Sequence, residues 1–309
     1  MKRIITGIFV TVILLVSAGC SSEVKDEVTN NNNNNNNNQS KTEGNNENTK
    51  PVSKSVSKKM SEHQGHSTDK TQDGSKKQIV TQAKLNVPKE VTPNQPINLA
   101  INIQDQAGKP VSKFDVFQEK LMHLIVVSND LEHFDHLHPE YKKNGRFEVN
   151  AKFPHPGEYA LFSDYKPAGQ TETVSLVNVN VPGTVPLPKS LSKYEKTKII
   201  SDTKVNLNID KEKIKAGEDV NLTFEIKDKN NQAVKDIQPY LGEKGHLVII
   251  KGSSVLSKSD YIHAHSIKDD ADGKVKFYTK FPQSGTYKMW MQFKRNGEIK
   301  TADFWINVE

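Results

Sequence analysis

Short runs of apolar residues recur from about residue 79 to the C-terminus, some alternating with polar residues and some continuous. They are rich in β-branched and aromatic residues, and examples lie at 97–103, 124–127, 159–165 and 274–281. Turn-forming sequences such as Lys143-Asn144-Gly145 separate them. No long segment has the periodicity of an amphipathic helix, so the pattern predicts an all-β fold.

The apolar pattern occurs twice in the same order. Segment 122–127 (MHLIVV) corresponds to 245–250 (GHLVII), and 153–159 (FPHPGEY) corresponds to 281–287 (FPQSGTY), with an offset that drifts only from 122 to 128. Each unit has about 100 residues, a normal domain size. We therefore expect two tandem immunoglobulin-like antiparallel β-sandwich domains. Their predicted ranges are 79–181 and 203–309, joined by a proline-containing linker at 182–202.

The N-terminus carries two positive residues, Lys2 and Arg3, followed by an apolar run at 4–16 that is too short to span a bilayer comfortably. The next residues, VSAGC at 16–20, resemble the lipobox of bacterial lipoproteins. The resemblance implies a lipoprotein signal peptide at 1–19, removed when a diacylglyceryl group is attached to Cys20. The alternative is an ordinary signal peptide with an incidental cysteine.

Lipidation of Cys20 would place the protein at the cell membrane, held by lipid on the extracytoplasmic face. Cys20 is the only cysteine, so neither an internal disulfide nor a thiolate metal site can form. The formal net charge of +6 comes mostly from isolated lysines. That distribution suits a solvated surface near anionic lipids and argues against a nucleic-acid partner.

Residues 20–78 contain almost no large apolar side chains and include an unbroken asparagine run at 30–38. Such a segment cannot bury enough surface to offset its backbone entropy, so we expect a disordered tether. His63 and His66 lie in it, close to Met60. They could be weak metal ligands, or histidines that a polar linker contains by chance.

The histidines of the two units correspond in pairs: His123 with His246, His136 with His263, and His138 with His265. Histidines two positions apart on a strand point to the same side, and a third from a neighbouring strand could complete a nitrogen site. Imidazole binds copper and zinc, and the affinity order favours copper, with zinc as the alternative cofactor. The sequence thus predicts one candidate metal site per unit. Alternatively, these histidines bond backbone at a sheet margin or lie in exposed loops.

Met289 and Met291 follow the second histidine pair, and their thioethers would suit Cu(I) as weaker candidate ligands. Residues 287, 289, 291 and 293 also share one side of a strand, which is the pattern of a sandwich core. His133, Asp135 and His155 have no counterpart in the second unit and are expected at the surface.

Segments 122–127 and 134–140 (FDHLHPE), with the PGEY step at 156–159, are similar to the YtkA-like domains of exported bacterial proteins. The resemblance implies a secreted β-sandwich of poorly defined function, often suspected of handling metals. It is weaker in the second unit, where HAHS at 263–266 replaces HLHP.

No nucleophile elbow, phosphate-binding glycine loop or paired-carboxylate hydrolase signature is present, so an enzyme is not expected. The leading hypothesis is a membrane-anchored lipoprotein that captures or passes a transition metal, with an envelope metal-handling protein as a possible partner. The alternative is a non-catalytic scaffold lipoprotein that binds another envelope protein and whose histidines are incidental.

Overall fold

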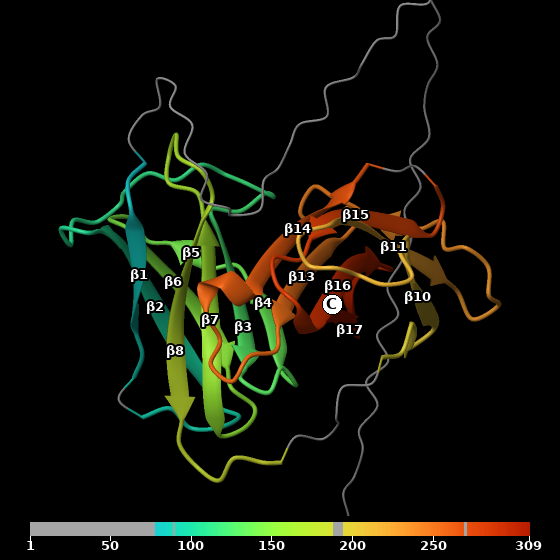
Figure 1. Ribbon diagram of the computed structural model, residues 1–309. Coiled ribbons are helices and arrows are strands. Elements are labelled where there is room, and N and C mark those ends of the chain that lie inside the picture. Colours follow the sequence, from blue (N-terminus) through green and yellow to red (C-terminus); the bar gives the residue numbers. More distant parts are fainter. Residues whose placement is uncertain (1–77, 89, 188–193, 269–270) are drawn as a thin grey trace, which may run out of the picture. The chain divides into compact units, whose positions relative to one another are not determined.

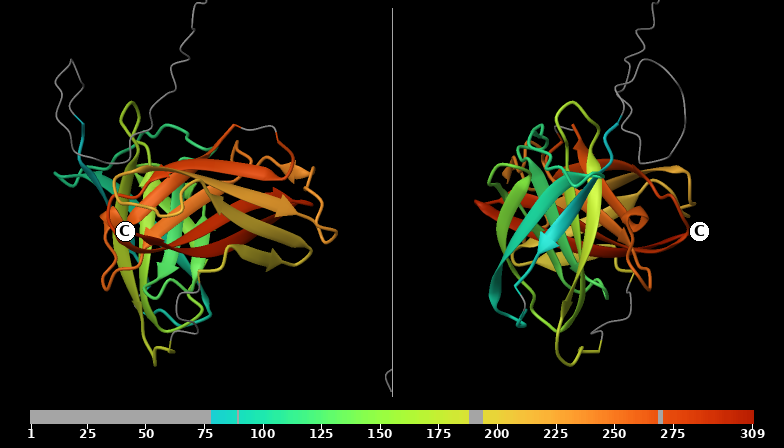
Figure 2. Two further views of the ribbon diagram at one scale, coloured as in Figure 1. Left: turned by 45° about the vertical axis from the view of Figure 1, so that its right-hand side comes forward. Right: turned by 90° about the vertical axis from the view of Figure 1, so that its left-hand side faces the viewer.

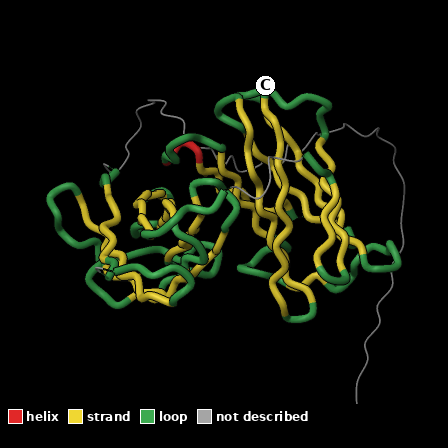
Figure 3. The backbone as a smooth tube through the Cα atoms, turned by 90° about the horizontal axis from the view of Figure 1, so that it is seen from below, coloured by secondary structure: helices red, strands yellow, loops and turns green. Residues whose placement is uncertain are grey.

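The computed structural model describes residues 78–88, 90–187, 194–268 and 271–309. Within these residues the chain is almost entirely strand and loop, which confirms the predicted all-β fold (Figure 1). The only helical turn there is the 3-10 turn η1 (Lys258–Asp260), drawn red in Figure 3. The predicted signal peptide, Cys20, His63 and His66 lie outside the described residues. None of the described helical segments is long and apolar enough to cross a membrane.

The first sandwich consists of two antiparallel sheets of four strands each. One sheet has the order β1 (Thr81–Asn86), β2 (Pro96–Asp105), β6 (Arg146–Lys152) and β5 (Glu140–Tyr141). The other has the order β4 (Phe134–Leu137), β3 (Met122–Ser128), β7 (Gly157–Tyr165) and β8 (Thr173–Val181). Apolar residues from both sheets fill one core, including Leu99 and Phe147 from the first and Leu124 and Leu161 from the second.

The second sandwich repeats this plan with more strands. One side contains β9 (Thr197–Ile200), β10 (Thr203–Ile209), β11 (Asp219–Lys227) and β15 (Lys274–Lys280). The other contains β12 (Ile237–Gln238), β13 (His246–Lys251), β14 (Tyr261–Ile267), β16 (Gly285–Arg295) and β17 (Glu298–Val308). The long β16–β17 hairpin is the red pair of strands in Figure 2. Strand β9 lies inside the range 182–202 that the sequence assigned to the linker, and it pairs with β10.

The two sandwiches differ where a strand passes from one sheet to the other. In the second sandwich β14 pairs with β13 over its first five residues and with β15 over its last two, so all its strands form one continuous sheet. In the first sandwich the corresponding stretch is divided into β4 and β5, with Pro139 between them. Proline has no N–H to donate to a ladder, whereas Ser266 occupies the corresponding position in β14.

Met289 and Met291 are fully buried in the core of the second sandwich, among its leucine, valine and phenylalanine side chains. Their prediction as weaker metal ligands is therefore wrong. They alternate with outward-facing residues of β16, and the methionine thioethers fill the core as the alternation favoured.

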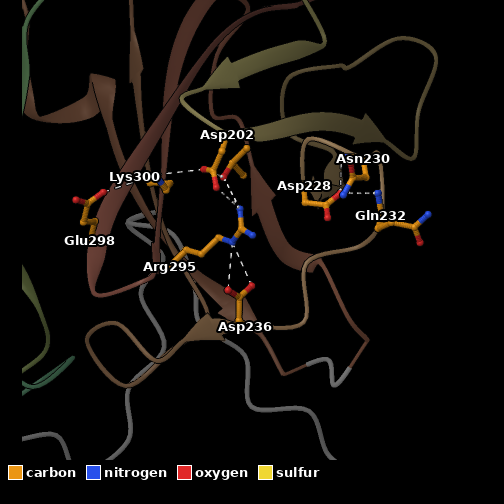
Figure 4. A network of polar contacts seen from close by, with 9 residues as sticks. Asp202, Asp228, Asn230, Gln232, Asp236, Arg295, Glu298 and Lys300 are labelled. Carbon is orange, nitrogen blue, oxygen red and sulfur yellow. Dashed lines mark hydrogen bonds and ion pairs between the residues drawn. The ribbon is translucent and has the colours of Figure 1, made fainter.

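A polar network at the surface ties three parts of the second sandwich together (Figure 4). Arg295 donates from Nε to Asp236 at 3.1 Å and from Nη1 to Asp202 at 3.3 Å. Lys300 Nζ lies 3.7 Å from Asp202. Because Asp202 lies between β9 and β10, these contacts fix β9 against the β16–β17 hairpin.

The two sandwiches also share a hydrophobic cluster, separate from their own cores. In it Phe134 stacks on Trp290 with ring centroids 4.8 Å apart, and Phe162 stacks on Tyr261 at 5.0 Å. In the repeat alignment Phe134 corresponds to Tyr261 and Phe162 to Trp290. Each sandwich therefore gives the same two positions to the contact, which makes the contact approximately two-fold symmetric. In Figure 1, β3 and β4 lie on this side of the first sandwich, and β13 and β14 on this side of the second.

Candidate metal centre

His123 lies at the start of β3, where successive side chains point to opposite faces. Met122, Leu124 and Val126 enter the core of the first sandwich, whereas Ile125 and Val127 enter the shared cluster. His123 has the same parity as Ile125, so its ring continues the row that faces the second sandwich. It is fully buried there.

His136 and His138 follow on the neighbouring strand. His136 is opposite Ile125 in the β3–β4 register, which brings it beside His123 on the same face. One nitrogen from each of His123, His136 and His138 lies within 4.8 Å of the others, and His123 Nδ1 is 3.0 Å from His136 Nε2. The three histidines predicted for the first unit therefore converge, as the sequence indicated.

In His123 and His136, one ring nitrogen faces the other histidine and the second is hydrogen-bonded elsewhere. The second bond decides which nitrogen carries the proton. His123 donates from Nε2 to the carbonyl oxygen of Phe117 at 3.3 Å, which leaves the lone pair on Nδ1. His136 donates from Nδ1 to Gln292 Oε1 at 2.8 Å, which leaves its lone pair on Nε2. The Gln292 amide nitrogen donates to Thr301 Oγ1 at 3.2 Å and so fixes that orientation. Two lone pairs thus face each other at a separation suited to two ligands of one ion.

His138 provides the third nitrogen. Its Nε2 is buried and has no hydrogen-bond partner among the described residues. Its ring centroid is 5.1 Å from that of His123 and 4.8 Å from that of His136. A buried polar atom without a partner is costly, and a metal ion bound by Nε2 would remove that cost.

The electrostatic environment keeps these imidazoles neutral. Burial lowers the pKa of His123 far below its ordinary value, and the neighbouring imidazoles lower it further. Burial likewise holds the pKa of His136 well below the ordinary range. Burial, followed by the nearby Lys120 charge, lowers the pKa of His138 to about 4. Neutral imidazole is the form that coordinates a metal, so near neutral pH no proton has to be displaced.

Among the described residues, His246 and His263 belong to no group of three convergent ligand atoms. The site predicted for the second unit also needs the side chain of His265, which lies outside the described residues, so that site stays a prediction. His246 is fully buried at the start of β13 and donates from Nε2 to the carbonyl oxygen of Tyr240 at 3.1 Å. His263 donates from Nδ1 to Asp164 Oδ2 at 2.9 Å, which reaches back to the first sandwich. Their rings lie 5.6–6.3 Å from those of His123 and His136. These short distances arise because the histidines of both sandwiches lie on the faces that the sandwiches turn toward each other.

The remaining predicted residues divide into two groups. The backbone of His265 pairs with that of His246, but the His265 side chain lies outside the described residues. His133 Nε2 lies 3.3 Å from Asp135 Oδ2, and His155 is exposed. Neither His133 nor His155 belongs to the convergent group found among the described residues.

Sequence reasoning missed Asp164 and Gln292, the side chains that orient His263 and His136. A signal was present: Asp164 pairs directly with His123 in the β3–β7 register, and Gln292 pairs with His246 in the β13–β16 register. The repeat therefore places a polar residue opposite each strand-initial histidine. The equivalence of Asp164 and Gln292 is not evident from the sequence, because one side chain is a carboxylate and the other an amide.

Comparison with solved structures finds distant similarity to several multidomain β proteins. A two-domain fibronectin type III segment of chicken tenascin is 12% identical, with 74% of this chain and 99% of that chain covered and a TM-score of 0.23. Invasin, a bacterial integrin-binding protein, is 14% identical, with 72% and 39% covered and a TM-score of 0.21. Matches at this level do not define the fold, which rests on the sheets described above.

Comparison with curated proteins finds no match. A family model described as a domain of unknown function, DUF8832, matches the chain twice, at residues 77–183 and 198–309. The two matches confirm the tandem duplication that the sequence indicated and together cover more than half of the chain. The chain therefore belongs to the DUF8832 family, of which it carries two copies.

Proposed function

We propose that this protein is a membrane-anchored, extracytoplasmic lipoprotein that captures or passes a transition metal ion at His123, His136 and His138. The observation that carries the proposal is the convergence of three neutral imidazoles, of which that of His123 is buried and those of His136 and His138 are partly buried. Hydrogen bonds leave lone pairs of His123 and His136 facing each other, and His138 adds a buried unpaired nitrogen. We infer a binding role rather than catalysis, with an envelope protein as donor or acceptor of the ion.

The ligand set favours a divalent ion, copper(II) first and zinc(II) second. Imidazole nitrogen is the only ligand type in the convergent group, and the affinity order of divalent ions on such sites peaks at copper. The soft thioethers that would favour Cu(I) are in the core, because Met289 and Met291 face away from the histidines. The resemblance to YtkA-like domains supports the same role.

Titration of the full chain tests the binding proposal. His63 and His66 are first replaced by alanine, so that the tether adds no imidazole. Calorimetry should then show one tightly bound Cu(II) or Zn(II) per chain rather than one per sandwich, because the histidines form a single cluster. If both ions bind no more tightly than to a variant that also lacks His123, His136 and His138, the interaction-scaffold hypothesis replaces metal binding.

The lipid anchor has its own test at Cys20, the only cysteine in the chain. Cys20→Ser removes the sulfur that the acyl group requires, so the variant should be released from the membrane or remain unprocessed. Cell fractionation followed by a salt wash distinguishes lipid anchoring from electrostatic adhesion. A Cys20→Ser protein that is cleaved at the same position and stays in the washed membrane fraction would contradict the lipoprotein proposal.

A further inference from the structure

Four histidine rings, two from each sandwich, form one cluster in which every pair of ring centroids is 5.1–6.3 Å apart. The pair in the first sandwich, His123 and His136, has ring centroids 5.1 Å apart, and the pair in the second, His246 and His263, has them 5.9 Å apart. The four distances between the pairs are 5.6, 6.0, 6.3 and 6.3 Å. No ring of the four is therefore remote from any other.

The hydrogen bonds behind these rings follow the approximate two-fold symmetry. The strand-initial histidines, His123 and His246, both donate from Nε2 to a backbone carbonyl of their own sandwich. The partner histidines, His136 and His263, both donate from Nδ1 to a side chain of the other sandwich. Each sandwich thus orients a histidine of its neighbour. The nitrogens that these bonds do not use are Nδ1 of His123 and His246, and Nε2 of His136 and His263.

These separations are somewhat wider than those of four imidazoles bound to a single ion. With metal–nitrogen bonds of about 2.0 Å, each ring centroid is roughly 3 Å from the ion, so two rings are about 5 Å apart at a tetrahedral angle and about 6 Å apart when opposite. Four rings around one ion cannot all be at the wider end of this range, because their average separation is then at most about 5 Å. The observed separations run from 5.1 to 6.3 Å, so metal binding has to draw the four rings inward by about half an ångström.

Charge supports the same arrangement. Asp164 is 2% exposed, and its Oδ1 has no hydrogen-bond partner among the described residues, while Oδ2 accepts from His263 and from the Tyr261 hydroxyl. A buried carboxylate is costly unless a positive charge lies near it. A divalent ion on His263 would supply that charge, and carboxylates commonly orient metal-bound histidines in this way.

We propose that His246 and His263 are ligands of the same metal centre as His123 and His136, so that one ion joins the two sandwiches. The inference rests on the proposed function, because it presumes that the cluster takes a metal ion. It adds that neither sandwich holds the complete site. An ion so surrounded by imidazole has little room for a substrate, which suits storage or transfer rather than catalysis.

Side-chain nitrogen NMR tests this centre without altering its ligands. The full chain carrying His63→Ala and His66→Ala is labelled with ¹⁵N and given one equivalent of Zn(II), which is diamagnetic. We expect the coordinated nitrogens of His246 (Nδ1) and His263 (Nε2) to shift together with those of His123 (Nδ1) and His136 (Nε2). Shifts confined to His123, His136 and His138 would overturn the shared centre and leave the proposed function intact. If none of these histidines shifts, both proposals fail.

Histidine variants provide a second test of the shared metal centre. His246→Ala with His263→Ala should weaken Zn(II) binding at least about tenfold, because ligands are lost. X-ray absorption of the zinc-loaded variant should count fewer imidazoles than in the unaltered cluster. The matched pair His133→Ala and His155→Ala removes two histidines outside the cluster and should change neither quantity. An unchanged affinity and imidazole count in the His246/His263 variant would contradict the shared centre.

Discussion

Replacing both His136 and His138 with alanine should lower the affinity for Cu(II) and Zn(II) by at least about a hundredfold, equivalent to roughly 3 kcal/mol of binding free energy. The double variant removes two of the three convergent nitrogens and leaves His123 alone in the first sandwich. Both substituted residues lie in or just after the four-residue strand β4, so we expect the sandwich itself to survive. Calorimetry or competition with a chelator measures the loss, and circular dichroism checks the β structure.

The matched control for this pair is His133→Ala with His155→Ala. These residues belong to the same sandwich, and neither belongs to the convergent group. The control therefore removes as many imidazoles as the double variant does, and it should keep the unaltered affinity. Equal losses in the two variants would mean that the chain binds metal through general histidine content, and the specific site would then be rejected.

Trp290→Ala should lower the free energy of unfolding by about 3–5 kcal/mol, the range for removing a large buried aromatic side chain. Trp290 is 4% exposed, yet it faces outward from its own sandwich and stacks on Phe134 of the first sandwich. The variant therefore tests the shared cluster and leaves the core of the second sandwich intact. For two sandwiches of this size we expect the melting temperature to fall by roughly 10 °C, measured by calorimetry.

Tyr278→Ala is the control, since Tyr278 is an aromatic residue of β15 in the same sandwich and is 49% exposed. Its removal should change the free energy of unfolding by no more than about 0.5 kcal/mol. If Trp290→Ala is no more destabilising than this control, the shared cluster does not stabilise the protein, and the case for one metal centre across it weakens as well.

Much of the fold could be predicted from the sequence because strand signals are local. Alternating apolar residues and turn sequences mark most strands, and the correspondence of 122–127 with 245–250 shows the duplication without any coordinates. The convergence of His123, His136 and His138 was also within reach. A histidine on one strand and two on its hairpin partner must meet if they share a face.

Other features depended on sheet pairing that no short pattern specifies. Thioethers at 289 and 291 suit either a core or a soft metal site, and only the position of β16 within the sandwich decides for the core. The orienting side chains Asp164 and Gln292 lie far along the chain from His263 and His136, which they contact. Nothing in the local sequence of either histidine indicates them.

By itself the sequence determined the two sandwiches, their order and the residue types available for a site. The sequence also indicated that two strands are covered on both faces, because Leu124–Val127 and Leu247–Ile250 are apolar without alternation. Only the tertiary structure decided what covers the second face. Each sandwich covers the other, so equivalent histidines that are far apart in sequence meet in one cluster. Periodicity records which face of a strand is apolar, but the identity of the covering surface depends on shape and packing across the whole chain.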